Sequence, residues 1–543
     1  METKTGVFIC DCGESIRNID FAIVREEVAK FPGVACVKLS SNLCLEEGKG
    51  KMLSCIKEEN IDRVVVAACS PELKGHIFQR VLENAGLNSH LISVANIREQ
   101  CSWVHEGDVT EKAVELIKMA LNRARLLQPV EKEEIPVNTE VLVVGGGFPA
   151  MNSAIRFSRL GLRTTLLERE SALGERAREF EDLYGLDTSS MIRAVEGDEN
   201  IEIFTSAEVI GVKGKIGDYI VRIRKGMEEI SRNFGAIVVA TDSEAELVDH
   251  ELQLSPGVTF VTQEKLAHML RSSGLHGKPE TVGFVFDLYD ENSRFTTLAT
   301  LSNALAVKQR WGSEVYVFCR NVKVDSEGAG KLYREAREHG VVFLKFEENP
   351  GISMEDGRVK IEAKDVIIGE DVILGCDLLI AEERLLPAKG TGALSSLLNM
   401  KTDSQGFYQE ENVHLYPVAS ERKGIFFMGD CRGYFDIRRA LIDASSVVLS
   451  VYQLLSPGKI EVEAEKVKAD PNKCVACLTC IRVCPHGAIG LVRMDGEKEV
   501  AEISDLACDG CGICAAICPA KAIKFEGYSD EQILAQIEAI GAA

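Results

Sequence analysis

Two cysteine runs near the end of the chain restrict its fold more than any other feature. The first is Cys474-Val-Ala-Cys477-Leu-Thr-Cys480-Ile-Arg-Val-Cys484-Pro485, and the second is Cys508-Asp-Gly-Cys511-Gly-Ile-Cys514-Ala-Ala-Ile-Cys518-Pro519. Each follows the pattern C-x2-C-x2-C-x3-C-P, in which three thiolates bind one [4Fe–4S] cluster and the fourth binds a neighbouring cluster. The predicted ligands of one cluster are Cys474, Cys477, Cys480 and Cys518. Those of the second are Cys508, Cys511, Cys514 and Cys484.

A zinc ribbon or a disulfide knot would be the alternative interpretations of these cysteines. Two complete runs that both close with Cys-Pro favour iron–sulfur ligation instead. The sequence therefore predicts a C-terminal two-cluster ferredoxin domain of the α+β type, and a chain that carries single electrons.

Composition narrows the class of protein further. Eighteen cysteines in 543 residues indicate a reducing compartment and metal ligation rather than a disulfide scaffold. The chain has no apolar run of about 18 residues and no signal-peptide pattern, so we expect no membrane span and a cytoplasmic location. A net charge of −22 makes nucleic acid a poor partner and favours soluble redox proteins.

The order of apolar segments predicts an α/β protein of several domains. Strand patterns near residues 6–10, 34–39, 63–68 and 90–95 alternate with helical patterns, which is typical of a parallel α/β sheet. A second α/β body follows, and a short helix at 530–540 ends the chain, either to cap the ferredoxin domain or to dock a partner. The predicted N-terminal α/β domain covers residues 1–130. The dinucleotide-binding domain has two parts, 137–245 and 376–456, and a degenerate NAD(P)-type domain at 246–375 lies between them. The ferredoxin domain covers 465–527, and a helical segment, 528–543, follows it.

The N-terminal sheet carries a third candidate cluster site. Four cysteines come just after its four predicted strands, at Cys12, Cys44, Cys69 and Cys101. Those strand ends share one edge of a parallel sheet, where ligands bind, so the four thiols are predicted to hold a further [4Fe–4S] cluster. Cys10 is the substitute if one assignment is wrong. Buried cysteines are also common as small apolar residues, and Cys36 and Cys55 are interpreted in that way.

A dinucleotide site is predicted where the second body begins. Residues 141–150 read as a strand that turns into a helix through G-x-G-x-x-A. Gly145 allows the tight turn, Gly147 allows close approach to a diphosphate, and Ala150 takes the place of the third glycine. Glu168 follows the next strand, where a partner of the ribose 2′-hydroxyl belongs. Later in the chain, Gly429-Asp430 resembles the turn with which two-dinucleotide-binding flavoproteins hold FAD.

The segment between residues 240 and 376 takes the place of the NAD(P)H domain of such flavoproteins. Its strand at 282–288 is followed by Tyr289-Asp-Glu-Asn-Ser-Arg-Phe and not by a glycine-rich turn, so no cradle for nicotinamide phosphates is expected. No Cys-x-x-Cys occurs between residues 102 and 473, which excludes a disulfide of the thioredoxin-reductase type. The flavin is therefore predicted to exchange electrons with iron–sulfur clusters.

Together these segments resemble the A subunit of heterodisulfide reductase. The resemblance rests on the flavin motif, both cysteine runs and four further segments: Gly6-Val-Phe-Ile-Cys-Asp-Cys-Gly13, Val64-Val-Val-Ala-Ala-Cys-Ser-Pro71, residues 95–105 and residues 530–537. It implies an N-terminal parallel α/β domain, a thioredoxin-reductase-like flavoprotein body and a ferredoxin domain. It also implies an FAD-containing oxidoreductase subunit whose flavin bifurcates electrons between ferredoxin and a second acceptor. The implied partners are B/C-like subunits, a small [2Fe–2S] donor subunit of the hydrogenase or formate dehydrogenase type, and ferredoxin, in a dimer within a larger cytoplasmic complex.

Several positions depart from that family pattern. The inserted second ferredoxin module is absent, and Phe295-Thr-Thr-Leu-Ala-Thr-Leu-Ser302 stands where many relatives have a cysteine-rich segment. Glu175 and Asp242 add carboxylates where glycine usually lets the chain approach the anionic cofactor, which would disfavour FAD.

The functional class therefore has alternatives. A non-catalytic iron–sulfur electron wire with an empty flavin pocket is one, and an NAD(P)H-dependent flavoprotein reductase is another. Cys431 is interpreted as a packed thiol, while Arg432 and Arg438-Arg439 are open between neutralising the flavin and lying on the surface.

Overall fold

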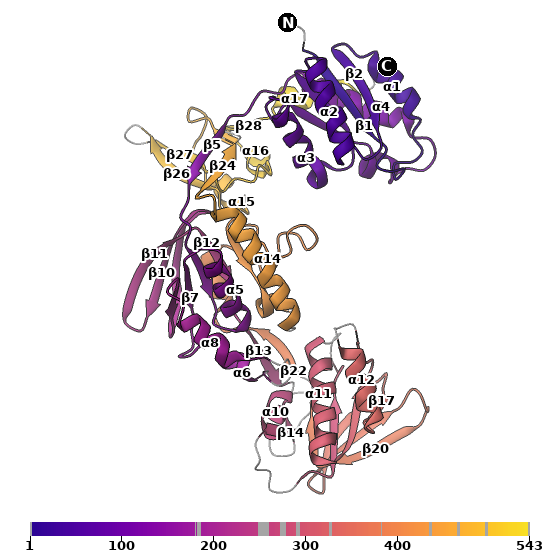
Figure 1. The fold of residues 1–543 in the computed structure, drawn as a ribbon, viewed down its shortest axis with the longest axis vertical. Coiled ribbons are helices and arrows are strands. Elements are labelled where there is room, and N and C mark those ends of the chain that lie inside the picture. The colour runs from indigo at the N-terminus through magenta and orange to yellow at the C-terminus, as the bar shows by residue number, and fades with distance from the viewer. Residues whose placement is uncertain are drawn as a thin grey trace. The chain divides into compact units, whose positions relative to one another are not determined.

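The computed structural model describes residues 3–179, 181, 186–247, 260–271, 278–288, 294–324, 328–381, 383–433, 437–463, 467–494 and 498–540. The chain divides into two compact units (Figure 1). The first contains residues 1–134, 461–484 and 488–543, and the second contains residues 135–460 and 485–487. Short strands β5 (Lys132–Pro136) and β24 (Lys459–Glu463) lie at the two junctions.

The first unit begins with a parallel sheet of order β2-β1-β3-β4. Its strands are β1 (Thr5–Cys10), β2 (Val34–Ser40), β3 (Arg63–Ala68) and β4 (Ile92–Asn96). All six residues of β1 are buried, as expected for a parallel strand that is covered on both faces. The strands lie within two residues of their predicted starts and ends.

Helices connect these strands and cover the sheet. They are α1 (Phe21–Ala29), α2 (Glu46–Glu58), α3 (Pro71–Asn84), the π-helix η1 (Arg98–Ser102) and α4 (Thr110–Ala124). Asp20 begins α1, because its carboxylate accepts the N–H groups of Ala22 and Ile23 at 2.9 and 3.2 Å. The carboxyl ends of the four strands therefore share one edge, which the loops at residues 10–20, 40–45, 69–70 and 97–109 form.

The ferredoxin module belongs to the same unit. It pairs β25 (Val467–Ala469) with β28 (Ile523–Phe525) and β26 (Ile489–Met494) with β27 (Lys498–Ile503), both antiparallel. Two short helices, α15 (Thr479–Val483) and α16 (Ile513–Ile517), each begin after the second cysteine of a run and contain the third, Cys480 or Cys514. The module is thus two similar halves, one for each run.

The C-terminal helix α17 (Asp530–Glu538) packs against α4 of the N-terminal sheet. The side-chain amide of Gln532 donates to the carbonyl of Leu126 at 3.0 Å, and Arg123 donates to the carbonyl of Gly527 at 3.0 Å. The guanidinium of Arg123 also lies 4.3 Å from the centre of the Tyr528 ring. Neither predicted alternative named this contact, in which the end of the chain joins the ferredoxin module to the N-terminal domain.

The second unit contains the dinucleotide-type sheet, of order β23-β12-β6-β7-β8 and parallel throughout. Its strands are β6 (Val141–Val144), β7 (Thr164–Leu167), β8 (Ile201–Phe204), β12 (Ala236–Val239) and β23 (Ile425–Phe427). An antiparallel sheet of β9 (Ala207–Lys215), β10 (Asp218–Lys225) and β11 (Glu228–Phe234) packs beside it. The helices of this part are α5 (Phe148–Arg159), α6 (Glu175–Glu179), α8 (Thr188–Glu196), α13 (Thr391–Leu398) and α14 (Ile437–Leu455), with the 3-10 turn η2 (Gly429–Arg432).

A further parallel sheet, of order β14-β21-β15-β16-β17, takes the place predicted for the NAD(P)-type domain. Its strands are β14 (Phe260–Val261), β15 (Thr281–Val285), β16 (Glu314–Cys319), β17 (Val342–Lys345) and β21 (Leu378–Ile380). Beside it lie an antiparallel sheet and three helices: β18 (Gly351–Glu355), β19 (Arg358–Lys364), β20 (Asp371–Cys376), α10 (Gln263–Arg271), α11 (Arg294–Trp311) and α12 (Ala329–Glu338). Strands β13 (Ser243–Leu247) and β22 (Glu383–Pro387) pair where the chain enters and leaves this part.

The segment that replaces the second glycine motif falls only partly within the described residues. Residues 289–293 lie outside the described part of the chain, and the cysteine-free segment 295–302 lies on α11. Among the residues that the structure describes, no helix combines the length and hydropathy needed to span a membrane.

Candidate redox sites

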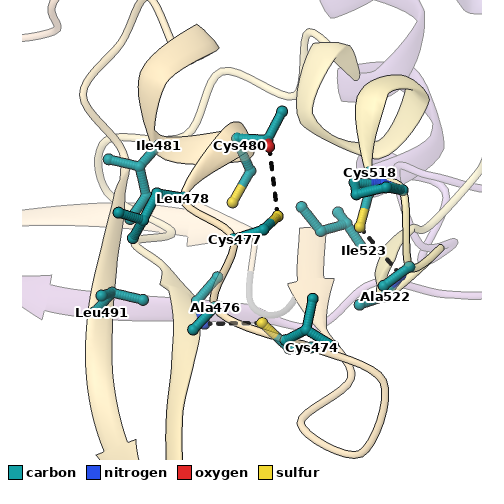
Figure 2. A pocket seen from close by; sticks show the side chains of 15 residues that line it. Cys474, Ala476, Cys477, Leu478, Cys480, Ile481, Leu491, Cys518, Ala522 and Ile523 are labelled. Atoms are coloured by element: carbon teal, nitrogen blue, oxygen red, sulfur yellow. Dashed lines mark hydrogen bonds between the residues drawn. The ribbon is translucent and has the colours of Figure 1, made fainter.

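The four cysteines predicted to hold the first cluster line a single pocket (Figure 2). Cys474, Cys477 and Cys480 come from the first run, and Cys518 comes from the end of the second. The other lining side chains are mostly apolar, among them Leu478, Ile481, Leu491 and Ile523. The fold thus brings together three cysteines of one loop and one distant cysteine in a mostly apolar pocket.

Left-handed backbone residues shape both cysteine loops. In the first run Ala476 and Leu478 have φ values of 51° and 65°, and at the matching positions of the second run Gly510 and Gly512 have 70° and 78°. Residues with a Cβ pay about 1–2 kcal/mol to adopt this conformation. Its occurrence at the same two positions of both runs means that each loop curls around its own site and points its N–H groups inward.

The four cysteines predicted to hold the second cluster also lie near one another. Cys514 is buried, and its pKa is raised to about 11, first by desolvation and then by the nearby sulfurs of Cys508, Cys484 and Cys511. Those four cysteines are the set that the spacing predicts for the second cluster.

Backbone N–H groups point at several of these sulfurs. Ala522 donates to Cys518 Sγ at 3.3 Å, as Figure 2 shows, and Ala488 donates to Cys484 Sγ at 3.4 Å. The two contacts are equivalent, because each donor lies four residues after the last cysteine of its run. Such hydrogen bonds stabilise negative charge on sulfur and raise the reduction potential of a bound cluster.

Three of the N-terminal cysteines, Cys10, Cys12 and Cys69, lie together at the strand ends. Cys12 Sγ lies 3.6 Å from Cys10 Sγ and within hydrogen-bonding reach of Cys69. The N–H of Leu43, the neighbour of Cys44, donates to Cys10 Sγ at 3.2 Å. Hydrogen bonding with Cys12 lowers the pKa of Cys10 and of Cys69 and raises that of Cys12 itself.

Cys101 has other surroundings. It lies on the π-helix η1, is fully buried, and its thiol donates to the carbonyl of Val109 at 3.8 Å. Burial raises the pKa of this thiol. The structure places Cys10 beside Cys12 and Cys69, with Cys44 on the adjoining loop and Cys101 on η1.

Within the described ranges, no three Cys, His, Asp or Glu side chains are close enough to hold one metal ion. The ferredoxin cysteines are no exception. Their spacing does not conflict with cluster ligation, because each cysteine binds a different iron of a [4Fe–4S] cube.

The glycine turn of the second unit is fixed by the protein's own packing. Gly145 has a φ of 126°, and a Cβ there would lie 2.2 Å from the carbonyl oxygen of Ala240. A Cβ on Gly146 would lie 2.5 Å from Glu168 Oε2, so this predicted ribose partner rests directly on the turn. Burial raises the pKa of Glu168, although backbone N–H groups, with Glu170 first, oppose the shift. Ala150 is buried where α5 packs on the sheet.

The predicted Gly429-Asp430 turn reaches the same region. It follows β23, which is parallel to β12, and Gly429 has a φ of 73°. A Cβ on Gly429 would lie 3.6 Å from Pro149 at the start of α5. The late turn and the glycine motif are therefore neighbours at the carboxyl edge of the sheet, where dinucleotides bind.

A cavity of about 400 Å³ opens at this edge, and its lining is strongly acidic. Its carboxylates are Glu168, Glu170, Glu175, Glu208, Asp242 and Glu244, against the cations Arg169 and Lys389. Asp242 lies against the second glycine of the G-x-G-x-x-A turn, since its Oδ1 lies 2.6 Å from the position of a Cβ on Gly147 at the start of α5. The turn and Glu168 fit the ribose half of a dinucleotide, whereas Asp242 opposes a diphosphate at the start of α5.

Two buried residues near this edge, Arg432 and Cys431, contact other groups of the protein interior. Arg432 is buried and forms ion pairs with Asp443 at 2.7 Å and Glu410 at 3.5 Å. It is therefore not a surface residue, and these ion pairs hold its guanidinium against protein carboxylates. The Cys431 thiol is buried and donates to the carbonyls of Met428 and Val239 at 3.3 and 3.5 Å, as expected of a packed thiol.

Comparison with known proteins agrees with this architecture. Residues 466–527 match the 4Fe-4S dicluster domain, and residues 140–226 match the pyridine nucleotide-disulphide oxidoreductase domain. The A subunit of the H(2):CoB-CoM heterodisulfide,ferredoxin reductase of Methanothermobacter marburgensis is 30% identical, over 99% of this chain and 97% of that protein. The chain belongs to the A-subunit family of heterodisulfide reductases.

Other relatives of the family are similar along nearly the whole chain. The A subunit of the Ferredoxin:CoB-CoM heterodisulfide reductase of Methanosarcina mazei is 27% identical over 99% of this chain and 81% of that protein. A protein of Archaeoglobus profundus described as similar to the heterodisulfide reductase A subunit is also 27% identical, over 99% of this chain and 98% of that protein. The alignment with the Methanothermobacter protein spans 647 positions against 543 residues here, so at least 104 of its positions have no counterpart in this chain.

Among solved structures, thioredoxin reductase from T. acidophilum has a TM-score of 0.40 and 17% identity, covering 58% of this chain and 99% of that one. Thioredoxin reductase from Lactococcus lactis has a TM-score of 0.42 and 18% identity, covering 59% of this chain and 100% of that one. The domain matches and the sheets confirm the predicted fold class. As a family member, the chain is an oxidoreductase subunit, and its domains support iron–sulfur and flavin cofactors.

We expect Cys518→Ser to remove about four irons per chain, because Cys518 completes the first ligand set although it belongs to the second run. Iron analysis after anaerobic purification measures this loss. Cys431→Ser is the matched control and should keep the full iron content, since its thiol lies in an apolar core. Equal iron in Cys518→Ser and the parent protein would contradict the exchange of the fourth cysteine between runs.

We expect Asp242→Asn to tighten FAD binding at least about tenfold. Two like charges about 4 Å apart repel by about 4 kcal/mol at an effective dielectric constant near 20, and each 1.4 kcal/mol is about tenfold in affinity. Titration of flavin-free protein with FAD measures the change. Glu199→Gln, the same change of charge at an exposed residue outside the cavity, should leave the dissociation constant unchanged. An unaltered affinity in Asp242→Asn would show that this carboxylate does not face the diphosphate.

Proposed function

We propose that this chain is the FAD- and [4Fe–4S]-containing electron-transfer subunit of a heterodisulfide-reductase-type complex. The observation that carries the proposal is the pocket lined by Cys474, Cys477, Cys480 and Cys518, in a chain that also has a dinucleotide-binding edge. When bound, FAD supplies the exchange between electron pairs and single electrons, and the clusters supply single-electron transfer.

The protein's own groups have separate tasks in this proposal. The eight ferredoxin cysteines bind the irons of two clusters, and the N–H groups of Ala488, Ala501 and Ala522 stabilise the charge on three of their sulfurs. Mostly apolar side chains line the first pocket beside these cysteines. Glu168 accepts the ribose hydroxyl, Gly145 and Gly147 admit the dinucleotide backbone, and the Gly429-Asp430 turn contacts its far half.

A third cluster is proposed at the N-terminal sheet edge, with Cys10 in the place first given to Cys101. Cys10, Cys12 and Cys69 already lie together, and Cys44 follows the residue whose N–H contacts Cys10. Cys12 has a φ of 53°, the same left-handed geometry as the ferredoxin loops. The hydrogen bond with Cys12, and then the positive charge of Arg98, lower the pKa of Cys69, which favours thiolate there.

The proposed partners follow from the relatives. Their names combine H(2), ferredoxin and the CoB-CoM heterodisulfide, so we propose ferredoxin, B/C-like reductase subunits and a small [2Fe–2S] donor subunit for this chain. We also propose a dimer within a larger cytoplasmic complex, and a flavin that bifurcates electrons between ferredoxin and a second acceptor. Redox proteins of this kind suit a chain with a net charge of −22 better than nucleic acid does.

A second candidate function is an iron–sulfur electron wire whose flavin pocket stays empty. It is favoured by one observation, the carboxylate of Asp242 against Gly147 in an acidic cavity. An NAD(P)H-dependent reductase is less well supported, because β15 continues into Phe286-Asp287-Leu288 without the glycines that a phosphate needs.

Anaerobically purified protein should contain about twelve irons and one FAD per chain, from three four-iron clusters. Cys10→Ser should lower the iron content to about eight, whereas Cys101→Ser should keep about twelve. NADH alone should leave the flavin oxidised. Flavin-free protein with full iron would favour the electron wire. Rapid bleaching of the flavin absorbance by NADH would favour the NAD(P)H-dependent reductase. Loss of iron in Cys101→Ser but not in Cys10→Ser would show that Cys101 is the ligand.

A further inference from the structure

We propose that Cys36 and Cys55 form a reversible dithiol–disulfide pair in the N-terminal domain, separate from every proposed cluster. Their sulfurs lie 2.7 Å apart. Cys36 is on strand β2 and Cys55 on helix α2, so 19 sequence positions separate them. Neither belongs to a ligand set of the proposed function, and this inference does not rest on that function.

The distance itself points to covalent pairing. The contact between Cys10 and Cys12 in the same domain is 3.6 Å, 0.9 Å longer than that between Cys36 and Cys55. A disulfide bond brings two sulfurs to about 2.05 Å, so the pair is about 0.7 Å from bonding distance.

The surroundings allow one sulfur to react and the other to complete the bond. Strand β2 is an edge strand and Cys36 is half-buried, whereas Cys55 has 4% of its surface exposed. An oxidant of the disulfide class, such as glutathione disulfide, would therefore meet Cys36 first. Cys36 Sγ attacks and releases one small thiol; Cys55 Sγ then attacks the mixed disulfide and releases the second. Two electrons and two protons leave the pair, and they appear in the two released thiols.

The electrostatics around Cys36 favour a slow reaction. Burial and then the neighbouring Cys55 raise the pKa of Cys36 to about 12, so little thiolate exists near neutral pH. Lys38 opposes this rise and Glu59 adds to it. Half-exposed disulfides are also the ones that cellular thiols reduce most readily.

The bond would close a ring around the loop at residues 41–45. This loop carries Leu43, whose N–H contacts Cys10, and Ser41, whose hydroxyl donates to Asp11 at 2.6 Å. The start of α2 already rests on it, because a Cβ on Gly48 would lie 2.5 Å from Leu43 Cα. Oxidation would thus fasten both ends of the segment that faces the strand-end cysteines.

Trypsin would release the two cysteines in separate short peptides, residues 31–38 and 52–57. The full chain, kept anaerobic, is equilibrated with mixtures of reduced and oxidised glutathione, quenched in acid, alkylated under denaturing conditions and digested. We expect a linked peptide pair in excess oxidised glutathione and two alkylated peptides in excess reduced glutathione. Amide exchange in the loop at 41–45 should be several-fold slower in the oxidised protein.

Two single variants act as controls. In Cys55→Ser the linked pair should vanish while Cys36 accepts glutathione, and in Cys36→Ser neither modification should occur at Cys55. Both should keep the iron content of the parent protein, which separates this pair from the cluster ligands. Full alkylation of both peptides in excess oxidised glutathione, or links from either cysteine to other positions, would overturn the inference. Loss of iron in either variant would also overturn it, because that cysteine would then belong to a cluster site.

Discussion

Cluster ligation requires sulfur atoms from distant parts of the chain to meet in one pocket, and the ferredoxin module is organised around that requirement. In its described part, the buried apolar cluster has seven residues, one of them Cys514, and five more cysteines pack against it. Left-handed residues at matching positions of both runs give the two cysteine loops the same backbone turns. So small an apolar core provides little stability alone, and bound clusters would form much of the interior.

At the carboxyl edge of the dinucleotide-type sheet, shape and charge have opposite effects on cofactor binding. The backbone there is already shaped for a dinucleotide, because Gly145 and Gly146 have no space for a side chain and Glu168 lies against the turn. Charge works in the opposite direction, since six carboxylates line the cavity and Asp242 lies at the start of α5. The shape of the site and its charge therefore make opposite contributions to binding an anionic cofactor. This contrast is absent from the cysteine pocket, whose described lining is mostly apolar.

Much of this could be read from the sequence, because short-range patterns determine it. The strands at 34–40 and 63–68, the glycine turn and both cysteine runs depend on local spacing. The rest depends on contacts that spacing does not encode. The π-helix at Arg98–Ser102 turns Cys101 into the core, and the meeting of Cys36 with Cys55 depends on how α2 lies on the sheet edge. The docking of α17 through Arg123 and Gln532, and the burial of Arg432 with Asp443 and Glu410, are likewise long-range pairings.

The central claim is that electrons pass between the ferredoxin module and the flavin of the same chain. Anaerobic rapid mixing of FAD-loaded protein with reduced ferredoxin tests it most directly, with flavin absorbance followed in the parent protein and in Cys518→Ser at equal flavin content. We predict prompt flavin reduction in the parent protein and a rate at least about tenfold lower in the variant, which lacks one ligand of the first pocket. Equal rates in both proteins would contradict electron transfer by this route.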